Sequence, residues 1–207
     1  MPLVRVRKRK IMIAFKYTKT DGAEFLSHLD LLRHLDRTFK RAGIKVKTSE
    51  GFHPHPKIFM NNPLGLGIKS VAEYCAAECD YIESFKELFN ANSPGGIKCL
   101  DFKEVDENPN YAFTIDKCGY SAEGIAPFDT EEFLSRKEII ISDKRGREVD
   151  IRPRIYTVEC KNGTLYFTLG CGQNNLRPDL FCEFLEREYG GTASNLIKIS
   201  SYGKYTF

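Results

Sequence analysis

Residues 22–43 read GAEFLSHLDLLRHLDRTFKRAG, and this stretch predicts the amphipathic helix around which the fold is organised. Ser27 is a suitable N-cap, and Asp30 three residues later resembles the acidic member of a capping box. Gly43 follows at the position where glycine commonly takes the left-handed conformation that ends a helix. Apolar side chains recur at helical spacing and predict one buried stripe: Leu31, Leu32, Leu35, Phe39 and Ala42.

The segments around this helix repeat one order of elements. The first half predicts strands over 11–18, 44–48, 57–64, 72–82 and 97–105, with a second helix over 83–91. The second half predicts strands over 110–118, 137–142 and 196–207, helices over 129–136 and 177–191, and a hairpin over 154–170 that turns at Asn162-Gly163. Asp129 is the expected N-cap of the helix over 129–136.

Each half therefore has the order β-α-β-β-α-β with an additional strand or hairpin, which is the ferredoxin-like order. We predict an α+β fold of two tandem ferredoxin-like (β-α-β-β-α-β) units with antiparallel sheets, over residues 1–106 and 107–207. The polar, turn-forming segment DENPN, residues 106–110, joins them. A single α+β domain is the alternative.

Composition narrows the class of protein. The chain has 207 residues, of which 42% are hydrophobic, so a packed core is expected. No apolar run approaches the roughly 18 residues of a membrane helix, and no apolar signal-peptide region follows the basic N-terminus. The seven cysteines are odd in number and scattered, which favours a reduced protein of the cytoplasm over a disulfide scaffold.

Basic residues are clustered although the net charge is only +3. RVRKRK (residues 5–10) and KRGR (residues 144–147) indicate either a polyanion-facing surface or a solubilising tail and loop. On the long helix, Arg33, Arg37 and Arg41 share one face, which His34 and Lys40 flank. That face is suited to phosphate contact, although an ordinary solvated face has the same pattern.

Two Arg-Pro steps stand out in the second half. Arg152 and Arg177 each precede proline, so both are expected in extended conformation and directed outward. Arg177 also precedes a helix N-terminus, which favours anions. Ion pairs with Asp150 or Asp179 are the alternative.

SEGFHPHPKI, residues 49–58, holds two of the four histidines. Prolines after His53 and His55 stiffen the loop and place both imidazoles on one side. His28, just after the N-cap, is expected to have a lowered pKa because the helix dipole disfavours a cation there.

A metal or other cofactor is not expected. CAAEC, residues 75–79, lacks the partners of a zinc or iron–sulfur site, so its cysteines are expected to be small buried side chains. In NPLGLGIKS, residues 62–70, the glycines permit close backbone approach and Lys69 could reach a phosphate, although a simple bend is the alternative.

Several long motifs resemble one uncharacterised bacterial family, the radical-SAM-linked proteins: FLSHLDLLR, RAGIKV, SEGFHPHPKI, PLGLGIKSVAEY, VDIRP and LRPDL. Members of that family are fused to, or encoded beside, cobalamin-binding radical SAM proteins. The family usually has Asn at the position of His53, which argues against a ligand or base role for His53, whereas His28 and His55 match its pattern. This chain has no CxxxCxxC motif, so the resemblance implies a radical SAM enzyme on a separate chain as partner. Family members are often encoded near a ribonuclease and ribosomal proteins, which favours RNA, either tRNA or rRNA, as a second partner.

Three functions follow as hypotheses. The expected one is a non-catalytic RNA-binding accessory module that works with the radical SAM enzyme in RNA or ribosome modification. Its anion-binding candidates are Arg33, His34, Arg37, Arg41, His53, His55, Lys57, Lys69, Arg152 and Arg177. The second is a metal-independent RNA-processing enzyme with His28 or His55 as acid or base and Lys57 stabilising charge. The third is a domain that docks the radical SAM enzyme without touching nucleic acid.

Overall fold

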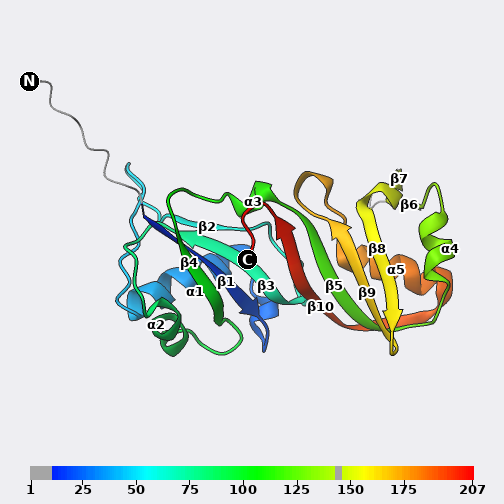
Figure 1. Ribbon diagram of the computed structural model, residues 1–207, viewed down its shortest axis with the longest axis horizontal. Coiled ribbons are helices and arrows are strands. Elements are labelled where there is room, and N and C mark those ends of the chain that lie inside the picture. The colour runs from blue at the N-terminus through cyan, green and yellow to red at the C-terminus, as the bar shows by residue number, and fades with distance from the viewer. Residues whose placement is uncertain (1–10, 143–145) are drawn as a thin grey trace, which may run out of the picture.

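A computed structural model describes residues 11–142 and 146–207 of the chain (Figure 1). The basic segment over 5–10, and Lys144 and Arg145 of the second basic cluster, lie outside the described residues. The centre of the molecule is an eight-stranded sheet in the order β4-β1-β3-β10-β5-β9-β8, with β2 also paired to β3. The fold is mixed α+β, and the pairing is mostly antiparallel. Among the described strands, only β3 and β10 pair in parallel.

The first half packs two helices on one face of its strands. Its elements are β1 (Met12–Lys19), α1 (His28–Arg41), β2 (Ile58–Met60), β3 (Lys69–Ala77), α2 (Phe85–Asn92) and β4 (Cys99–Val105). Alternate β1 side chains, from Ile13 to Tyr17, enter the core beneath α1 and α2, because successive strand residues face opposite sides of the sheet. Phe15 lies 5.9 Å from Phe39 of α1 and 5.4 Å from Phe89 of α2, measured between ring centroids.

The second half has its own layer of helices. Its elements are α3 (Tyr111–Thr114), β5 (Ile115–Ile125), α4 (Thr130–Ser135), β6 (Ile140–Ser142), β7 (Glu148–Asp150), β8 (Ile155–Lys161), β9 (Thr164–Gly170), α5 (Pro178–Tyr189) and β10 (Gly191–Gly203). Phe167 of β9 packs on Phe181 of α5 at 5.0 Å between ring centroids. β6 and β7 form a separate two-stranded sheet.

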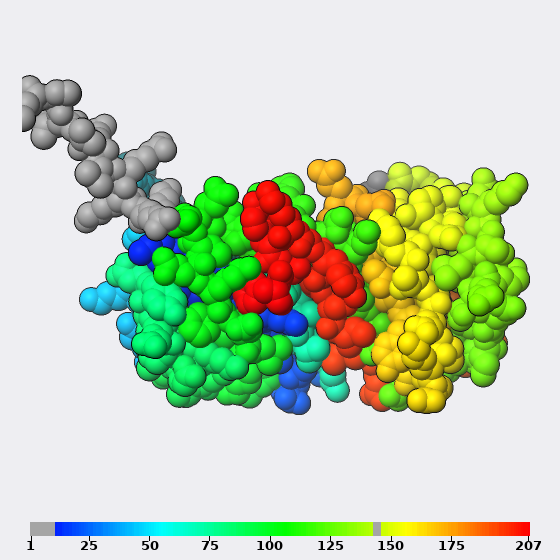
Figure 2. All heavy atoms as spheres, viewed as in Figure 1, coloured from blue at the N-terminus to red at the C-terminus, as the bar shows by residue number. Residues whose placement is uncertain are grey.

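The two halves share one continuous sheet. β3 pairs with β10 at Ile197 opposite Lys69 and at Lys198 opposite Ser70. Figure 2 shows the C-terminal segment, in red, crossing from the second half onto the first. There Tyr74 donates a hydrogen bond to the carbonyl oxygen of Phe207, whose ring lies 4.3 Å from the Lys103 ammonium. The division at residue 106 stays a prediction, since the halves are joined by both pairing and packing.

Most predicted elements lie where their local signals place them. The Ser27 hydroxyl accepts a hydrogen bond from the Asp30 amide, and Gly43 has a positive φ of 71°. The Asp129 carboxylate caps α4 by accepting the amides of Glu131 and Glu132. None of the helices within residues 11–142 and 146–207 has the length and apolar character needed to cross a bilayer.

One predicted strand was wrong, and another was predicted to begin too early. Residues 44–48 form no strand, and only Thr48 makes an isolated bridge, to Pro56. The predicted strand over 110–118 begins instead as the helical turn α3, because Asn110 has a positive φ of 51° and the Thr114 hydroxyl bonds the Pro109 carbonyl at 2.9 Å. Both segments are connections, in which turn chemistry overrides strand propensity.

Candidate functional site

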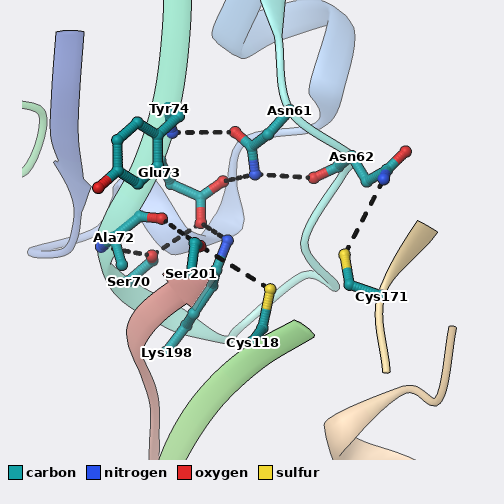
Figure 3. Close-up of polar contacts among 10 residues, drawn as sticks. All are labelled: Asn61, Asn62, Ser70, Ala72, Glu73, Tyr74, Cys118, Cys171, Lys198 and Ser201. Carbon is teal, nitrogen blue, oxygen red and sulfur yellow. Dashed lines mark hydrogen bonds and ion pairs between the residues drawn. The ribbon is translucent and has the colours of Figure 1, made fainter. Parts of the chain in front are cut away.

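A buried ion pair joins the two halves at the parallel β3–β10 pairing (Figure 3). The Lys198 ammonium lies 2.9 Å from the Glu73 carboxylate, and each side chain is only 3% exposed. Ser70 donates to one carboxylate oxygen at 2.7 Å, and the Asn61 amide donates to the other at 3.0 Å. The sheet register causes this meeting, because Lys198 stands opposite Ser70, three residues before Glu73.

The charges of this pair depend on each other. Burial by itself raises the pKa of Glu73, but Lys198 and the hydrogen bonds from Ser70 and Asn61 bring it below its usual value. Burial likewise lowers the pKa of Lys198, and the adjacent Glu73 carboxylate outweighs that effect and raises it. Both groups are therefore charged at neutral pH, in a place where an unpaired charge is very unfavourable.

Two cavities adjoin the ion pair, and the loop Asn62-Pro63-Leu64 lines both. The smaller holds about 10 Å³, and Lys19, His28 and Glu73 are among the residues that line it. The larger holds about 210 Å³ and is lined in part by Lys198 and Arg177. Glu73 thus belongs to one cavity and Lys198 to the other, so the ion pair stands between them.

Two thiols line the larger cavity. The Asn62 amide donates to the Cys171 sulfur at 3.9 Å, and the Cys118 sulfur lies 3.8 Å from the Ser201 hydroxyl (Figure 3). The neighbouring Cys118 thiol is the largest cause that lowers the pKa of Cys171, and the Lys198 charge contributes, so that this pKa is about 6. The pKa of Cys118 is raised, because it is the donor of the pair and is buried.

His28 lines the smaller cavity from the first residue of α1. Its pKa is lowered, as predicted, but the largest cause is burial rather than the helix dipole. Lys19 lines the same cavity and is 3% exposed. Burial lowers the pKa of Lys19, although the nearby Glu73 and Glu24 carboxylates act in the opposite direction and raise it. His28 therefore stands as a neutral imidazole at the mouth of a polar, charged pocket.

The His-Pro loop, residues 49–56, is held at its base. The Ser49 amide donates to the His55 carbonyl at 2.8 Å, and the His55 amide donates to the Ser49 hydroxyl at 2.9 Å. His53 and His55 are exposed, and Phe52 between Gly51 and His53 is fully exposed. Figure 1 shows this segment in cyan at the end of the molecule far from the second half.

Lys57 follows this loop but faces a carboxylate. Its ammonium lies 3.2 Å from the Glu78 carboxylate, which also pairs with Lys47 at 3.3 Å. These two lysines lower the pKa of Glu78 against the effect of burial. Lys57 is therefore balanced by an acidic partner within the protein.

The basic face of α1 is directed outward but partly neutralised. Arg33 lies 3.0 Å from Asp30, and Lys40 lies 2.6 Å from Asp36. Arg37 is exposed on the same face. Arg41 instead donates to the Asn92 carbonyl, which attaches α1 to the end of α2.

His34 lies near the same end of α2. One of its ring nitrogens is 3.5 Å from the Ser93 hydroxyl, and burial lowers its pKa, with Arg41 and Arg37 contributing. His34 is therefore a neutral side chain between the helices.

The two Arg-Pro arginines differ from each other. Arg152 begins the 3₁₀ turn Arg152–Arg154 and donates to three backbone carbonyls, of Leu134, Arg136 and Ile155. The expectation that it is extended and directed outward was therefore wrong. Its guanidinium fastens α4 to the start of β8. Arg177 lines the larger cavity and forms an ion pair with Asp179, which was the stated alternative. Lys69 is exposed at the start of β3, outside both cavities.

The three catalytic candidates do not converge. His28 begins α1, whereas Pro54 and Pro56, on either side of His55, line a groove with Lys40 near the end of that helix. Fourteen residues of α-helix span about 21 Å. A joint acid–base pair of His28 and His55 is therefore not formed, whereas His28 and Arg177 line adjoining cavities.

Within the described residues, no three His, Cys, Asp or Glu side chains gather as a metal site. Cys75 and Cys79 are buried, as expected of small apolar side chains, and burial raises their pKa values.

The sequence did not single out Glu73, Lys198, Cys118 or Cys171 as a site. One signal was present: SVAEYCAA, residues 70–77, places a carboxylate inside an otherwise apolar strand, which requires a buried partner. The identity of that partner depends on a pairing between residues far apart in the chain.

Comparisons with known proteins identify a family without a known activity. A family model matches residues 12–178, and it is described as "Uncharacterized protein conserved in bacteria (DUF2344)". No curated protein matches the chain.

Solved structures with low similarity to this chain include an encapsulated DyP-type peroxidase from Mycobacterium smegmatis, at 11% identity and TM-score 0.25, covering 93% of this chain and 90% of that one. An unknown protein from Galdieria sulphuraria matches at 11% identity and TM-score 0.26, covering 91% and 98%. A putative DyP-type peroxidase from Shewanella oneidensis matches at 10% identity and TM-score 0.23, covering 93% of this chain and 91% of that one. Scores this low establish no shared activity.

Proposed function

The chain belongs to the DUF2344 family of uncharacterised bacterial proteins, and we propose that it is a non-catalytic RNA-binding accessory module for a radical SAM enzyme of the cobalamin-binding type. This sequence contains no CxxxCxxC motif, which a radical SAM cluster needs, so we assign the radical chemistry to the enzyme and not to this module. The module would hold a single-stranded part of a tRNA or rRNA for modification.

One observation carries the RNA part of this proposal: a fully exposed phenylalanine at the tip of a stiff loop. Phe52 is exposed between a glycine and His53, while hydrogen bonds hold the base of the loop. Because this ring buries no surface, it contributes nothing to the stability of the fold. Unstacked RNA bases bind to such aromatic platforms, each by about 1–3 kcal/mol.

The surroundings of Phe52 fit a nucleic-acid backbone. Lys40 and Lys45 line the groove beside the loop together with Pro54 and Pro56. Arg37 is exposed one helical turn before Lys40 on the outward face of α1. Asp36 also lines the groove and pairs with Lys40, so we assign the phosphate contacts to Arg37 and Lys45 with Lys40 in support.

We interpret the fold as two ferredoxin-like units whose sheets are joined edge to edge by the pairing of β3 with β10. The first half pairs its strands in the order β4-β1-β3-β2, and the second in the order β10-β5-β9-β8. When the strands of each half are counted along the chain, the fourth strand lies beside the first, and the third lies between the first and the second. The proposed RNA surface then lies on the first unit, at the far end from the second.

Binding of a fluorescent single-stranded RNA, measured by anisotropy, tests the proposal. We expect the dissociation constant to rise at least about tenfold between about 50 and about 200 mM salt, as displaced counterions require for a few phosphate contacts. Phe52→Ala should weaken binding by about 5- to 100-fold, which corresponds to one lost stacking contact. Phe113→Ala is the matched control, because Phe113 is also exposed, at 73%, but lies in α3.

Equal binding by the Phe52→Ala and Phe113→Ala proteins, or binding that does not respond to salt, would refute the RNA surface. Co-purification with the radical SAM enzyme and no RNA affinity would favour the docking domain. Cleavage of RNA in EDTA that is lost in His28→Ala or His55→Ala would favour the RNA-processing enzyme.

A further inference from the structure

The larger cavity beside the ion pair contains two cysteines that the RNA proposal does not use. Cys118 is buried in β5, and Cys171 is half-buried immediately after β9. The β5–β9 ladder pairs Lys117 with Gly170, and the Cys171 amide donates to the Asp116 carbonyl at 2.7 Å. Cys171 therefore stands opposite Asp116, and Cys118 lies on the same face two residues along.

We propose that Cys118 and Cys171 form a redox-active dithiol that reacts with hydroperoxides, with Cys171 as the nucleophile and Cys118 as the resolving thiol. The cavity of about 210 Å³ gives a small peroxide access to the Cys171 sulfur, which the Asn62 amide also contacts. Cys118 lines the same cavity, and its raised pKa keeps it as a thiol, which is the form that resolves a sulfenic acid.

The charges around Cys171 favour the thiolate. Lys198 of β10 lines the same cavity and lowers the pKa of Cys171, although Glu73 partly balances its charge. Arg177, just before α5, and Asp179 in its first turn also line the cavity and neutralise each other. Tyr120 of β5 lines it as a neutral phenol, since burial raises its pKa. With the Cys118 donor, the pKa of Cys171 is about 6, so it is mostly thiolate at neutral pH.

The reaction balances with the peroxide as oxidant. The Cys171 thiolate attacks one peroxide oxygen, the O–O bond breaks, and the other oxygen leaves as hydroxide or alkoxide, so that Cys171 becomes a sulfenic acid. The Cys118 thiol then attacks that sulfur, an S–S bond forms, and the hydroxyl leaves with the Cys118 proton as water. The dithiol loses two electrons and the peroxide gains two.

The pH dependence of alkylation tests the nucleophile. Brief iodoacetamide labelling of the intact protein, resolved by peptide mass spectrometry, should give a Cys171 rate with its midpoint near the pKa of about 6. At pH 6 an ordinary thiol with a pKa of about 8.5 is only about 0.3% thiolate. After correction for the lower nucleophilicity of a less basic thiolate, Cys171 should react about tenfold faster than the cysteine of an unstructured model peptide at that pH. A Cys171 midpoint at or above pH 8 would overturn the proposal.

Treatment with hydrogen peroxide tests the resolving thiol. In the wild-type protein we expect a linked Cys118–Cys171 peptide that dithiothreitol releases, whereas Cys118→Ser should accumulate a dimedone-reactive sulfenic acid on Cys171. Cys160→Ser is the matched control, since Cys160 is exposed in β8 and should leave the link unchanged. If Cys118→Ser does not fold, the wild-type peptide map decides alone: peroxide oxidation without this link contradicts the pairing.

Discussion

Replacing Lys198 by Met tests whether the two halves depend on their buried ion pair. The substitution keeps an unbranched side chain in the sheet but removes the charge 2.9 Å from the Glu73 carboxylate. Glu73 is 3% exposed and would be left with the hydrogen bonds of Ser70 and Asn61 alone. Removing one partner of a buried pair costs about 3–5 kcal/mol of unfolding free energy, because an uncompensated charge stays in the interior.

Urea unfolding followed by circular dichroism measures this cost, and a thermal scan should show a melting temperature about 6–20 °C lower for a chain of this length. Lys161→Met is the matched control, since Lys161 lies at the same 2.9 Å distance from Glu159, but with side chains 61% and 58% exposed. Solvent screens that pair, so its loss should change stability by no more than about 1 kcal/mol.

The pH dependence gives a second, independent readout. In the wild-type protein the folded pKa of Glu73 lies below its unfolded value, so its stabilising contribution is present above about pH 4.3 and is lost as pH falls through the folded pKa. Without Lys198, burial dominates and raises the pKa of Glu73. In the variant, the contribution of Glu73 to folding stability is then greatest below about pH 4.3 and is lost as pH rises through the raised pKa. The stability gap between wild type and Lys198→Met should therefore narrow as pH is lowered from 7 toward 4.

Two results would refute this reasoning. One is a cost below about 1 kcal/mol for Lys198→Met, equal to that of the exposed control. The other is a double variant, Glu73→Gln with Lys198→Met, whose loss equals the sum of the single losses. A real coupling makes the double variant more stable than that sum, because it contains no unpaired buried charge.

Two further substitutions test local features of the fold by urea unfolding. Ser27→Ala removes the side-chain acceptor for the Asp30 amide and should cost about 1 kcal/mol, whereas Ser27→Asp should retain most of the stability. Gly96→Ala should cost more than Gly43→Ala, although both glycines have positive φ: a Cβ on Gly96 would lie 1.9 Å from the Thr20 carbonyl oxygen, while a Cβ on Gly43 meets open space. Equal losses at the two glycines would show that φ alone, and not this close approach, determines the cost.

The elements that could be predicted from the sequence are those whose cause is local. The turn at Asn162-Gly163 has positive φ at both residues, as a two-residue hairpin requires, and the residue types alone indicate it. The same holds for the Ser27 and Asp129 caps, whose partners are within three residues. The helical turn Tyr111–Thr114 was missed because its residues, three apolar ones followed by a threonine, fit a strand equally well.

The site could not be predicted in the same way because its residues meet through sheet register. Glu73 and Lys198 are separated by 125 positions, and their contact depends on the parallel pairing of β3 with β10. Arg152 shows a different failure: it was expected to be extended because it precedes proline, but it begins the 3₁₀ turn Arg152–Arg154. The carbonyls of Leu134, Arg136 and Ile155 hold its side chain inward, so neither its local conformation nor its tertiary partners could be predicted from the Arg-Pro step.

Lys198 connects the ion pair to the dithiol, and this links the two experiments. Its charge contributes to the low pKa of Cys171, while Glu73 holds the ammonium in position. Removing Lys198 should therefore move the midpoint of Cys171 alkylation to higher pH, even where the variant remains folded. Forming the disulfide would remove the thiolate that faces Lys198 and the sulfur acceptor of Asn62, whose amide also bonds the Ala112 carbonyl. Oxidation would then loosen the loop Asn62-Pro63-Leu64, which lines both cavities and lies far from the proposed RNA surface at the other end of the first half (Figure 1). We therefore expect peroxide treatment to change the urea midpoint of the protein and to leave its affinity for RNA unchanged.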